Sequence, residues 1–433
     1  MMKTIFKKII SLIITCEAIL IIKKYKPQII AVTGNVGKTS SKDAIFAVMS
    51  ISYFVRKSEK SFNSDIGIPL TILGCQNAWF NPIKWFRNIF YGLWLIIFTN
   101  KYPEWLILEV GADRPDDIKK VARWLKPNIV VLTAFAKVPV HVEFFKDRDA
   151  VVEEKKYLVN SLKQDGILIV NGDDEDSIKI KETSKNVSIV YGTGSMSDLV
   201  ASEINNYYGN SGEIEGVTFK VKYKENIVPI IIKGTLGEKS LYSSLSAIAV
   251  GLSQNINIVK AGEALLNLEA SRGRMRIIKG IKNTTIIDDT YNSSPKALTS
   301  ALDTLKEIKI QNNARKIAVL GDMMELGKHS VGEHYKAGKI VAEVCDILLT
   351  VGIRSTKIVE GALDGLLSEK NIYKFENSTD VGKVLKNLIR ENDLILVKGS
   401  QSTRMEKIVE EIMLEPDKAG ELLVRQEKAW KSI

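Results

Sequence analysis

The chain of 433 residues is 45% hydrophobic and 26% charged, so it can bury two or three separate cores and is not a disordered protein. Its cysteines, Cys16, Cys75 and Cys345, are far apart and form no CxxC pair, and it has only three histidines. This excludes a disulfide framework and a cysteine- or histidine-rich metal centre, and it favours a reducing compartment. The formal net charge is +10, but the chain shows no nucleic-acid module, so we expect no nucleic-acid partner.

The N-terminal segment, residues 1–27, carries much of the positive charge. An apolar run from Ile9 to Ile22, interrupted by Glu17, lies between lysines. It is shorter than a membrane span, which needs about 20 residues, and it lacks the cleavage site of a signal peptide. Two interpretations stay open: an anchor on an anionic cytoplasmic leaflet and a buried amphipathic first helix. The lysines are Lys3, Lys7, Lys8, Lys23, Lys24 and Lys26.

Residues 28–33 predict a buried strand, which is followed by a glycine-containing loop and a helix over about 40–50. Later strands alternate with helices near 115–125 and 149–162. Alternation of this kind indicates a mostly parallel, doubly wound sheet. The later strands are predicted at 105–110, 128–133, 166–170 and 187–191.

Residues 200–236 differ, because short alternating runs around polar turns predict an antiparallel patch on this sheet. Helices are expected at 240–253 and 258–268, and a hinge is expected from Ala270 to Arg274. A second α/β unit follows, with a last helix near 403–413. Its strands are predicted at 285–289, 316–320, 346–351, 371–375 and 393–398.

The predicted fold class is therefore α/β. We expect a P-loop central domain over 28–270, in which a mostly parallel sheet carries the antiparallel patch. A Rossmann-like α/β C-terminal domain is expected over 271–433. The chain contains no internal repeat and no low-complexity segment.

The sharpest local signal is the loop Gly34-Asn35-Val36-Gly37-Lys38-Thr39-Ser40 between the first strand and its helix. Backbone N–H groups at a helix N-terminus cradle phosphates, a lysine neutralises their charge, and a threonine can ligate Mg²⁺. The generic P-loop has four residues between its glycines, whereas this loop has two. A strand-to-helix turn with a solvent-exposed lysine is the alternative, but the buried strand before the loop favours phosphate binding.

Three further side chains are candidates for metal binding or catalysis. Glu109 ends an apolar strand at the edge where open α/β sheets bind ligands, so it is a candidate metal ligand, with a salt bridge as the alternative. His141 follows the strand 128–133 and falls in the same edge region, although a lone histidine is more often structural. Lys155 lies in a Glu-Glu-Lys-Lys cluster, which by itself predicts a solvated helix face.

Polar groups also end two strands of the second unit. One strand ends in Asp288-Asp289-Thr290-Tyr291-Asn292, whose Asp and Asn side chains could hold a ribose or an amine substrate. The alternative is ordinary capping of the helix that begins at Pro295. Another strand ends in Val397-Lys398-Gly399-Ser400. Each signal is weak alone, and their shared position at the carboxyl ends of strands gives them weight.

Together and in order over about residues 29–415, these segments resemble the Mur ligases. The loop Thr33–Ser40 is similar to the short phosphate loop of that family. The other segments are most similar to the branch of the family that adds D-alanyl-D-alanine to a muramyl tripeptide. The joint match is far more specific than any one motif. These segments are Phe62–Thr71, Glu109–Pro115, Asp288–Pro295, Val319–Gly327 and Lys398–Ser400.

The resemblance implies roles in the first domain. The loop, through Lys38 and Thr39 above all, would hold the triphosphate of ATP and its Mg²⁺. Glu109 and His141 match ligands of a second Mg²⁺. Lys155 matches a lysine that the family carbamylates, which makes an anionic ligand from a cation and reverses the solvated-face interpretation.

The resemblance also implies roles around the second domain. Arg274 and Asp289 would reach the nucleotide from the C-terminal domain. The incoming amino compound would lie near the side chains that end the strands of the second unit. The implied substrate residues are Asn63, Tyr291, Asn292, Lys398 and Ser400.

The chemistry implied by this resemblance is an ADP-forming ligation of a carboxylic acid to an amino compound. A carboxylate would attack the γ-phosphate of ATP, and an amine would then displace phosphate from the acyl phosphate. A lysine and two Mg²⁺ ions would stabilise the oxyanions, and closure about residues 270–276 would assemble the site. We expect a cytoplasmic monomer whose partners are a muramyl-peptide precursor of peptidoglycan and an amino acid or dipeptide.

The chain departs from the family pattern in three places. About 30 residues precede the phosphate loop, where members that use the tripeptide carry a separate uridine-nucleotide domain, so we expect that domain to be lacking. Lys239 and Ser243 stand where the family usually has His and Asn at the adenine contact, and Gln401 stands where Arg is usual. Two alternatives therefore stay open: a Mur-type ligase with a lipid-linked or other carboxylate acceptor, and a non-catalytic nucleotide-binding protein at the membrane.

Residues 85–98 form a dense aromatic and aliphatic stretch that is too short to span a membrane. The composition suits an interfacial helix with aromatic anchors, and a buried core helix is the alternative. We hypothesise that this stretch and residues 3–26 form one surface that faces the inner side of the membrane.

Overall fold

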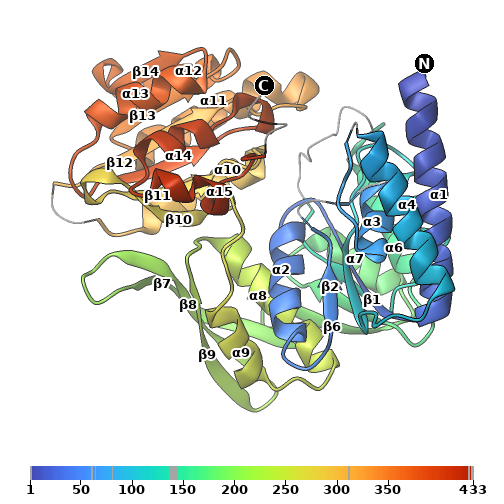
Figure 1. Ribbon diagram of the computed structural model, residues 1–433. Helices are drawn as coiled ribbons and strands as arrows, with labels where there is room; N and C mark the ends of the chain where they lie inside the picture. Colours follow the sequence, from blue (N-terminus) through green and yellow to red (C-terminus); the bar gives the residue numbers. More distant parts are fainter. Residues whose placement is uncertain are drawn as a thin grey trace.

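A computed structural model describes residues 2–59, 62–63, 65–79, 81–135, 145–310, 313–427 and 430, with side chains from residue 9 onward. Two β-sheets covered by helices follow one another along the chain (Figure 1). The first sheet is mostly parallel with an antiparallel end, and the second is built mainly from parallel strands. The predicted α/β fold class is confirmed.

The parallel part of the first sheet is formed by β1 (Gln28–Thr33), β2 (Val55–Lys57), β3 (Trp105–Glu109), β4 (Ile129–Leu132), β5 (Ile167–Asn171) and β6 (Val187–Gly192). The antiparallel patch is formed by β7 (Leu199–Tyr208), β8 (Ile214–Tyr223) and β9 (Asn226–Lys233). The strand order is β2-β3-β1-β4-β5-β6-β7-β8-β9. Because β1 pairs with both β3 and β4, the phosphate loop that follows it lies between the ends of these neighbours.

Helices cover both faces of this sheet, which explains why its parallel strands are apolar on both faces. Alternate residues of β1 show the two faces: Ile30 and Val32 belong to one apolar core, and Ile29 and Ala31 belong to the other. The first core includes residues of α2 (Lys38–Met49), α8 (Glu238–Ser253) and α9 (Ile258–Leu266). The second includes residues of α1 (Met2–Tyr25), α3 (Gly67–Leu73), α4 (Pro82–Ile97), α5 (Asp117–Ala122), α6 (Arg148–Asn160) and α7 (Glu175–Thr183).

The second sheet has the order β10-β11-β15-β12-β13-β14. Its strands are β10 (Arg276–Lys279), β11 (Thr285–Asp289), β12 (Lys316–Gly321), β13 (Ile347–Val351), β14 (Ile372–Phe375) and β15 (Leu394–Lys398). Its helices are α10 (Pro295–Glu307), α11 (Ser330–Val344), α12 (Thr356–Asp364), α13 (Ser378–Leu388), α14 (Glu406–Ile412) and α15 (Ala419–Leu422). The antiparallel edge strand β10, which the sequence did not predict, pairs with β11.

The N-terminal helix α1 packs against α3 and α4 at one side of the first sheet (Figure 1). Ile10, Ile14, Ala18 and Ile21 are buried on its inner face, so part of the apolar run lies in the core, as the buried-helix interpretation predicts. Other apolar side chains of the same run are exposed. Within the described ranges, no helix is both long and apolar enough to pass through a bilayer.

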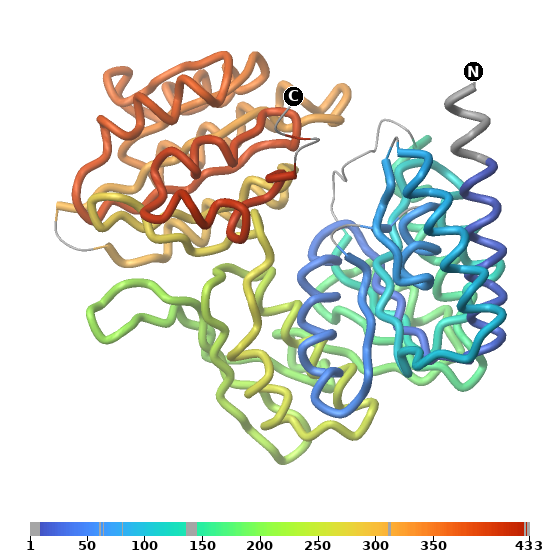
Figure 2. The backbone as a smooth tube through the Cα atoms, viewed as in Figure 1, coloured from blue at the N-terminus to red at the C-terminus, as the bar shows by residue number. Residues whose placement is uncertain are grey.

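The chain crosses from the first sheet to the second between α9 and β10 (Figure 2). Gly273 and Met275 in this crossing have positive φ values of 64° and 53°. This crossing segment is bonded to both parts of the chain. Gly273 accepts a hydrogen bond from the N–H of Tyr291, which follows β11, and Ser271 Oγ donates to Asp43 Oδ2 of α2 at 2.9 Å. These contacts bring Arg274 towards the end of β1.

Candidate active site

The phosphate loop has a backbone that only glycine adopts easily. Gly34 has φ 140°, and a Cβ there would lie 2.0 Å from Thr133 Oγ1, so the position excludes a side chain. Gly37, with φ 89°, is the residue before α2. The N–H groups of Asn35 and Val36 donate to the Ala134 carbonyl, which ties the loop to the end of β4. The loop therefore holds the N-terminus of α2 open towards a phosphate.

Lys38 folds back over the loop. Its Nζ donates to the carbonyl oxygens of Gly34 at 2.9 Å and Asn35 at 3.3 Å. Burial lowers the pKa of Lys38, Glu109 opposes this effect, and Arg274 adds to it. A lysine held over a helix N-terminus among other cations suits a polyanionic ligand, which would restore its charged form.

Thr39, the second residue of α2, meets Glu109 at the end of β3. Thr39 Oγ1 donates to Glu109 Oε2 at 2.8 Å, and both residues are buried. The Asn63 amide lies 3.5 Å from the other oxygen of Glu109, and the Asn63 carbonyl accepts from the Gly111 N–H. The structure thus brings three predicted site residues together at the carboxyl edge of the sheet.

Lys155 is buried in α6, so its helix face is not solvated. Burial lowers its pKa to about 7, and the nearby charge of Lys38 contributes in the same direction. The neighbouring Glu154 is fixed, because its carboxylate accepts from the backbone N–H groups of Asp116, Ile118 and Lys119 at the start of α5. A buried lysine with a pKa of about 7 is partly neutral at physiological pH, and only the neutral amine can add CO₂.

Arg274 reaches the first domain's site from the crossing segment. Its Nη2 donates to Thr39 Oγ1 at 3.0 Å, and its guanidinium lies 4.1 Å from the centroid of the Tyr291 ring. Asp288 holds this arrangement, since its carboxylate accepts from the Gly273 N–H and from Thr290 Oγ1. Burial raises the pKa of Asp288 to about 6.

Asp289 is the centre of a buried ion-pair group. Its Oδ2 lies 2.6 Å from Lys398 Nζ and 3.3 Å from Lys239 Nζ. Lys398 also donates to the Asn292 carbonyl at 2.9 Å. Burial lowers the pKa of Lys398 to about 8, Asp289 opposes this effect, and Lys239 and Arg274 add to it. Lys239, which we noted only as a departure from the family pattern, is therefore part of the site.

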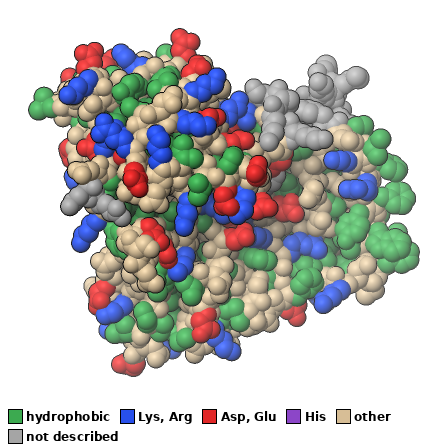
Figure 3. All heavy atoms as spheres, turned by 60° about the vertical axis from the view of Figure 1, so that its left-hand side comes forward, with side chains coloured by type: hydrophobic (Ala, Val, Ile, Leu, Met, Phe, Trp, Pro, Cys, Tyr) green, Lys and Arg blue, Asp and Glu red, His purple; other side chains and the backbone are tan. Residues whose placement is uncertain are grey.

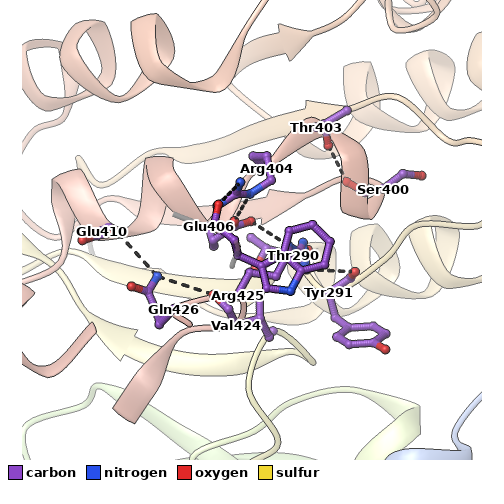
Figure 4. A network of polar contacts seen from close by, with 12 residues as sticks. Thr290, Tyr291, Ser400, Thr403, Arg404, Glu406, Glu410, Val424, Arg425 and Gln426 are labelled. Atoms are coloured by element: carbon purple, nitrogen blue, oxygen red, sulfur yellow. Dashed lines mark hydrogen bonds and ion pairs between the residues drawn. The ribbon is translucent and has the colours of Figure 1, made fainter. Parts of the chain in front are cut away.

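The loop after β11 is held by the C-terminal segment, an arrangement that the sequence motifs did not predict. Arg425 donates to the carbonyl oxygens of Thr290 at 2.6 Å and Tyr291 at 3.3 Å (Figure 4). Its guanidinium and that of Arg404 both contact the buried carboxylate of Glu406. These bonds fix the backbone from which the Tyr291 ring extends.

The remaining predicted residues have different surroundings. Ser400 Oγ accepts from the Met324 N–H, so the Ser400 side chain contacts a neighbouring strand-end loop. Ser243 is buried in α8 and donates to the Ser240 carbonyl. His141 lies outside the described residues. No signal in the sequence linked Lys239 to Asp289, because they are far apart along the chain.

The residues at the edge of the first sheet fit Mg²⁺ bound to a nucleotide. Magnesium ions in proteins take oxygen ligands, and they often use one or two carboxylates together with substrate phosphates. Thr39 Oγ1 and Glu109 supply such oxygens beside the phosphate loop. Among the described residues, no group of three or more His, Cys, Asp and Glu side chains is placed to hold a metal ion.

Two protein-family models match the chain. "Mur ligase middle domain" matches residues 87–251, and "Mur ligase, glutamate ligase domain" matches residues 273–401. The chain is 28% identical over 390 residues to UDP-N-acetylmuramoyl-tripeptide--D-alanyl-D-alanine ligase of Bacillus subtilis, a match that covers 90% of this chain and 76% of that protein. It is 27% identical to the Escherichia coli protein of the same name, over 88% of this chain and 76% of that one.

Solved structures show the same fold. The structure of MurF from Acinetobacter baumannii aligns with a TM-score of 0.74 and 21% identity, over 92% of this chain and 79% of that chain. The MurF ligase from Thermotoga maritima, solved in complex with ADP, aligns with a TM-score of 0.74 and 22% identity, over 94% of this chain and 84% of that chain.

Proposed function

The chain belongs to the Mur ligase family, and from that premise we propose that it is an ATP-dependent, ADP-forming ligase that joins an amino compound to a peptidoglycan precursor by a peptide bond. The curated relatives with the printed name UDP-N-acetylmuramoyl-tripeptide--D-alanyl-D-alanine ligase support a muramyl tripeptide and D-alanyl-D-alanine as its substrates. We place this reaction in the cytoplasm and assign it to a monomer.

One observation carries the proposal: Thr39 lies between Glu109 of the first sheet and Arg274 of the crossing segment. A nucleotide bound at the start of α2 would therefore be contacted from both parts of the molecule. Asp289 and Lys398, which form an ion pair at strand ends of the second sheet, are the groups that we assign to the second domain's side of the site. Such an arrangement suits a ligase, because the phosphate donor and the incoming amine must meet between two domains.

The first step that we propose is attack of the substrate carboxylate on the γ-phosphorus of ATP. A P–O bond to the carboxylate forms, the bond to the β-phosphate oxygen breaks, and ADP leaves. The chain's part is to align the phosphates and to balance the charge that develops on them. The loop N–H groups, Lys38 and Arg274 are the groups positioned to do so.

In the second step, the amine attacks the acyl carbon to give a tetrahedral intermediate, which expels phosphate. The amine loses a proton as the C–N bond forms. We assign the amine side of the site to Tyr291, Asn292 and Lys398, which lie together through the bond from Lys398 to the Asn292 carbonyl. The charged form of Lys398 would stabilise the oxyanion of the intermediate.

Thr39 and Glu109 are the described residues that would hold Mg²⁺, with His141 and a carbamylated Lys155 as further proposed ligands. When bound, Mg²⁺ supplies charge neutralisation of the phosphates. Carbamylation joins the neutral Lys155 amine to CO₂ and releases one proton, so a neutral amine becomes an anion; starting from the ammonium form, two protons are released. The depressed pKa of Lys155, caused first by burial, supports this reaction at neutral pH.

The test is ADP release from purified protein with Mg²⁺, bicarbonate, the uridine-linked tripeptide and D-alanyl-D-alanine. We expect release only when both substrates are present. Lys38→Ala should reduce it by at least about 100-fold, because Lys38 covers the phosphate loop. Lys126→Ala, which removes an exposed lysine, is the matched control. Unchanged activity of Lys38→Ala would refute the assignment of the phosphate loop.

A second candidate acceptor is a lipid-linked muramyl compound. The exposed apolar side chains of α1 and α4 favour it, because they give the first domain a face suited to a membrane. Release of ADP with the lipid-linked acceptor but not with the uridine-linked tripeptide would support this candidate. Binding of ATP without turnover on either acceptor would instead identify a non-catalytic nucleotide-binding protein.

A further inference from the structure

Helix α4 has two apolar faces. The inner face, with Trp85, Gly92 and Leu95, is buried against the rest of the first domain. The outer face is also apolar: the side chains of Phe86, Phe90 and Ile97 are 68%, 63% and 68% exposed. A helix of a water-soluble domain normally presents charged or polar residues on its outer face. The outer face of α4 therefore requires another explanation.

Helix α1 continues this surface. It packs along α4, and its own outer side chains Ile9, Leu12 and Leu20 are exposed. In Figure 3, apolar side chains crowd the right-hand edge of the molecule, the side on which α4 lies in Figure 1. We call this surface the α1–α4 face. Its exposed apolar residues are Ile9, Leu12, Ile13, Leu20, Ile83, Phe86, Phe90, Tyr91, Leu93, Trp94, Ile97 and Phe98.

The two helices are held together by specific contacts, so the face is a built surface. Lys24 Nζ donates to the carbonyl oxygens of Leu95, Ile96 and Phe98 at 3.0, 2.9 and 2.6 Å, which satisfies the C-terminal end of α4. The Tyr25 hydroxyl lies within hydrogen-bonding distance of two of the same carbonyl oxygens, those of Leu95 and Phe98, at 2.9 and 3.0 Å. Glu17 lies against Gly92, where a Cβ would come within 2.3 Å of its carboxylate.

Among the described side chains of helices α1 and α4, the exposed charged residues are all basic. Helix α4 carries Lys84 and Arg87 and no acidic residue, and both basic side chains are exposed. Lys23, Lys26 and Lys101 are exposed at the ends of the two helices. Apolar aromatic side chains with basic neighbours match the boundary between acyl chains and anionic headgroups.

We propose that the α1–α4 face docks the protein onto the surface of an anionic lipid bilayer, with the outer side chains of α4 inserted at the level of the headgroups. A second copy of this chain fits the face less well, because a two-fold contact would bring the basic residues of both copies together. The proposal concerns the surface alone and does not depend on which acceptor the ligase uses.

With the α1–α4 face on a membrane, the carboxyl edge of the parallel strands in the first sheet would lie next to that membrane. Because β1 follows α1 directly and β3 follows α4, the N-terminal ends of both helices lie towards the carboxyl edge of the parallel strands, where the phosphate loop begins. Ser11 Oγ of α1 contacts the Asp65 carbonyl at 3.4 Å, two residues from Asn63. An acceptor held in the same bilayer would thus approach the site from the side of Asn63.

The test is flotation of the full chain with vesicles of phosphatidylglycerol and phosphatidylcholine, compared with vesicles of phosphatidylcholine alone. We expect binding to the anionic vesicles that weakens as salt is added. The triple variant Phe86→Glu/Phe90→Glu/Ile97→Glu should lower the partition coefficient at least about tenfold, because each side chain loses its apolar contact with the bilayer. All three positions are exposed, so folding should be unaffected.

The matched control is Met196→Glu/Ile353→Glu, which changes exposed apolar residues outside the α1–α4 face and should bind vesicles like the parent chain. Light scattering after size exclusion measures the oligomeric state of each variant. Failure of the full chain to float with anionic vesicles would overturn the proposal. So would a dimer that the triple variant dissociates, or equal loss of binding in the control.

Discussion

Arg274 donates a hydrogen bond from Nη2 to Thr39 Oγ1 at 3.0 Å, and this bond joins the segment that enters the second sheet to the helix that follows the phosphate loop. The same guanidinium lies over the Tyr291 ring. Thr39 in turn donates to Glu109. Arg274 therefore contacts Thr39 of α2 and Tyr291 of the loop after β11, so it is placed to report on closure.

We predict that Arg274→Ala lowers kcat for ADP release on the order of 100-fold, because it removes the guanidinium that contacts Thr39 beside the phosphate loop. Arg274→Lys should recover only part of this loss, since an ammonium lacks the planar fork that contacts Thr39 and stacks on Tyr291. Steady-state kinetics with varied ATP will measure kcat and KM separately. Arg272→Ala, which removes a guanidinium bonded to the Gly420 carbonyl, is the control. A similar loss in that control would contradict a specific role.

The fold could be predicted where the sequence pattern is local. The buried strand at 28–33, the glycines at its end and the helix after them are neighbours in the chain, and they form β1, the loop and α2. The strand β10 and the helix α3 were not predicted. Strand β10 exists because it pairs with β11, and α3 is a short, buried helix that depends on its packing partners. Such elements need tertiary contacts that no short pattern encodes.

Without the family resemblance, the site could be predicted at the phosphate loop and where polar residues end apolar strands. Glu109 and Asp289 follow that pattern, and the structure places both at strand ends. The partners of these residues come from distant segments: Lys239 contacts Asp289, and Arg425 holds the Thr290 carbonyl. The burial of Lys155 was likewise hidden, because its neighbours in the sequence are charged. Only the folded chain shows that Glu154 turns inwards to the start of α5.

Lys155 should make the enzyme dependent on CO₂. Its pKa of about 7, lowered first by burial, means that the neutral amine increases as the pH rises from 6 to 8. At a constant concentration of dissolved CO₂, carbamylation and activity should therefore increase over this range. The measurement is ¹³C NMR of protein equilibrated with labelled bicarbonate, which should show one carbamate signal that Lys155→Ala abolishes.

Activity gives a second measure of the same group. Lys155→Ala should lower ADP release on the order of 100-fold, and an added short-chain carboxylic acid should restore part of it by supplying the missing anion. Lys156→Ala is the control, because Lys156 is the adjacent lysine and pairs with the exposed Glu153. A carbamate signal that persists in Lys155→Ala would assign the modification to another residue.

Lys239 should affect the pH above which activity falls, here called the alkaline limit, through its effect on the pKa of Lys398. Burial lowers the pKa of Lys398 to about 8, and the positive charge of Lys239 contributes to the shift. If the charged form of Lys398 is the active one, activity falls as the pH rises through about 8. Lys239→Ala removes the repulsion, so it should raise the pKa of Lys398 and move this limit to higher pH.

The profile of kcat between pH 6 and 10 measures this shift, and Lys233→Ala supplies the comparison, since Lys233 is a lysine paired with Glu215 away from Asp289. The limit in Lys233→Ala should stay where it is in the parent protein. A limit that stays fixed in Lys239→Ala, or that moves to lower pH, would show that Lys398 does not control the alkaline limb.

Glu17 should make the protein less stable as the pH rises. Its carboxylate is 3% exposed between α1 and α4, and neither oxygen has a hydrogen-bond partner among the described residues. Burial raises its pKa from 4.5 to about 7, so the folded chain binds more protons than the unfolded chain between these values. The free energy of unfolding should therefore fall from about pH 4.5 to about pH 7 and level off above it.

Glu17→Gln keeps the shape of the side chain and removes its titration, so this slope should be lost. At pH 8 the variant should be more stable than the parent by about 3 kcal/mol, which is the order expected for a shift of this size. Urea unfolding at pH 5 and pH 8 measures the difference, with Glu182→Gln, at an exposed position, as the control. If the free energy of unfolding changed with pH in the same way in Glu17→Gln and in the parent, ionisation of the buried Glu17 would not be the cause of the change.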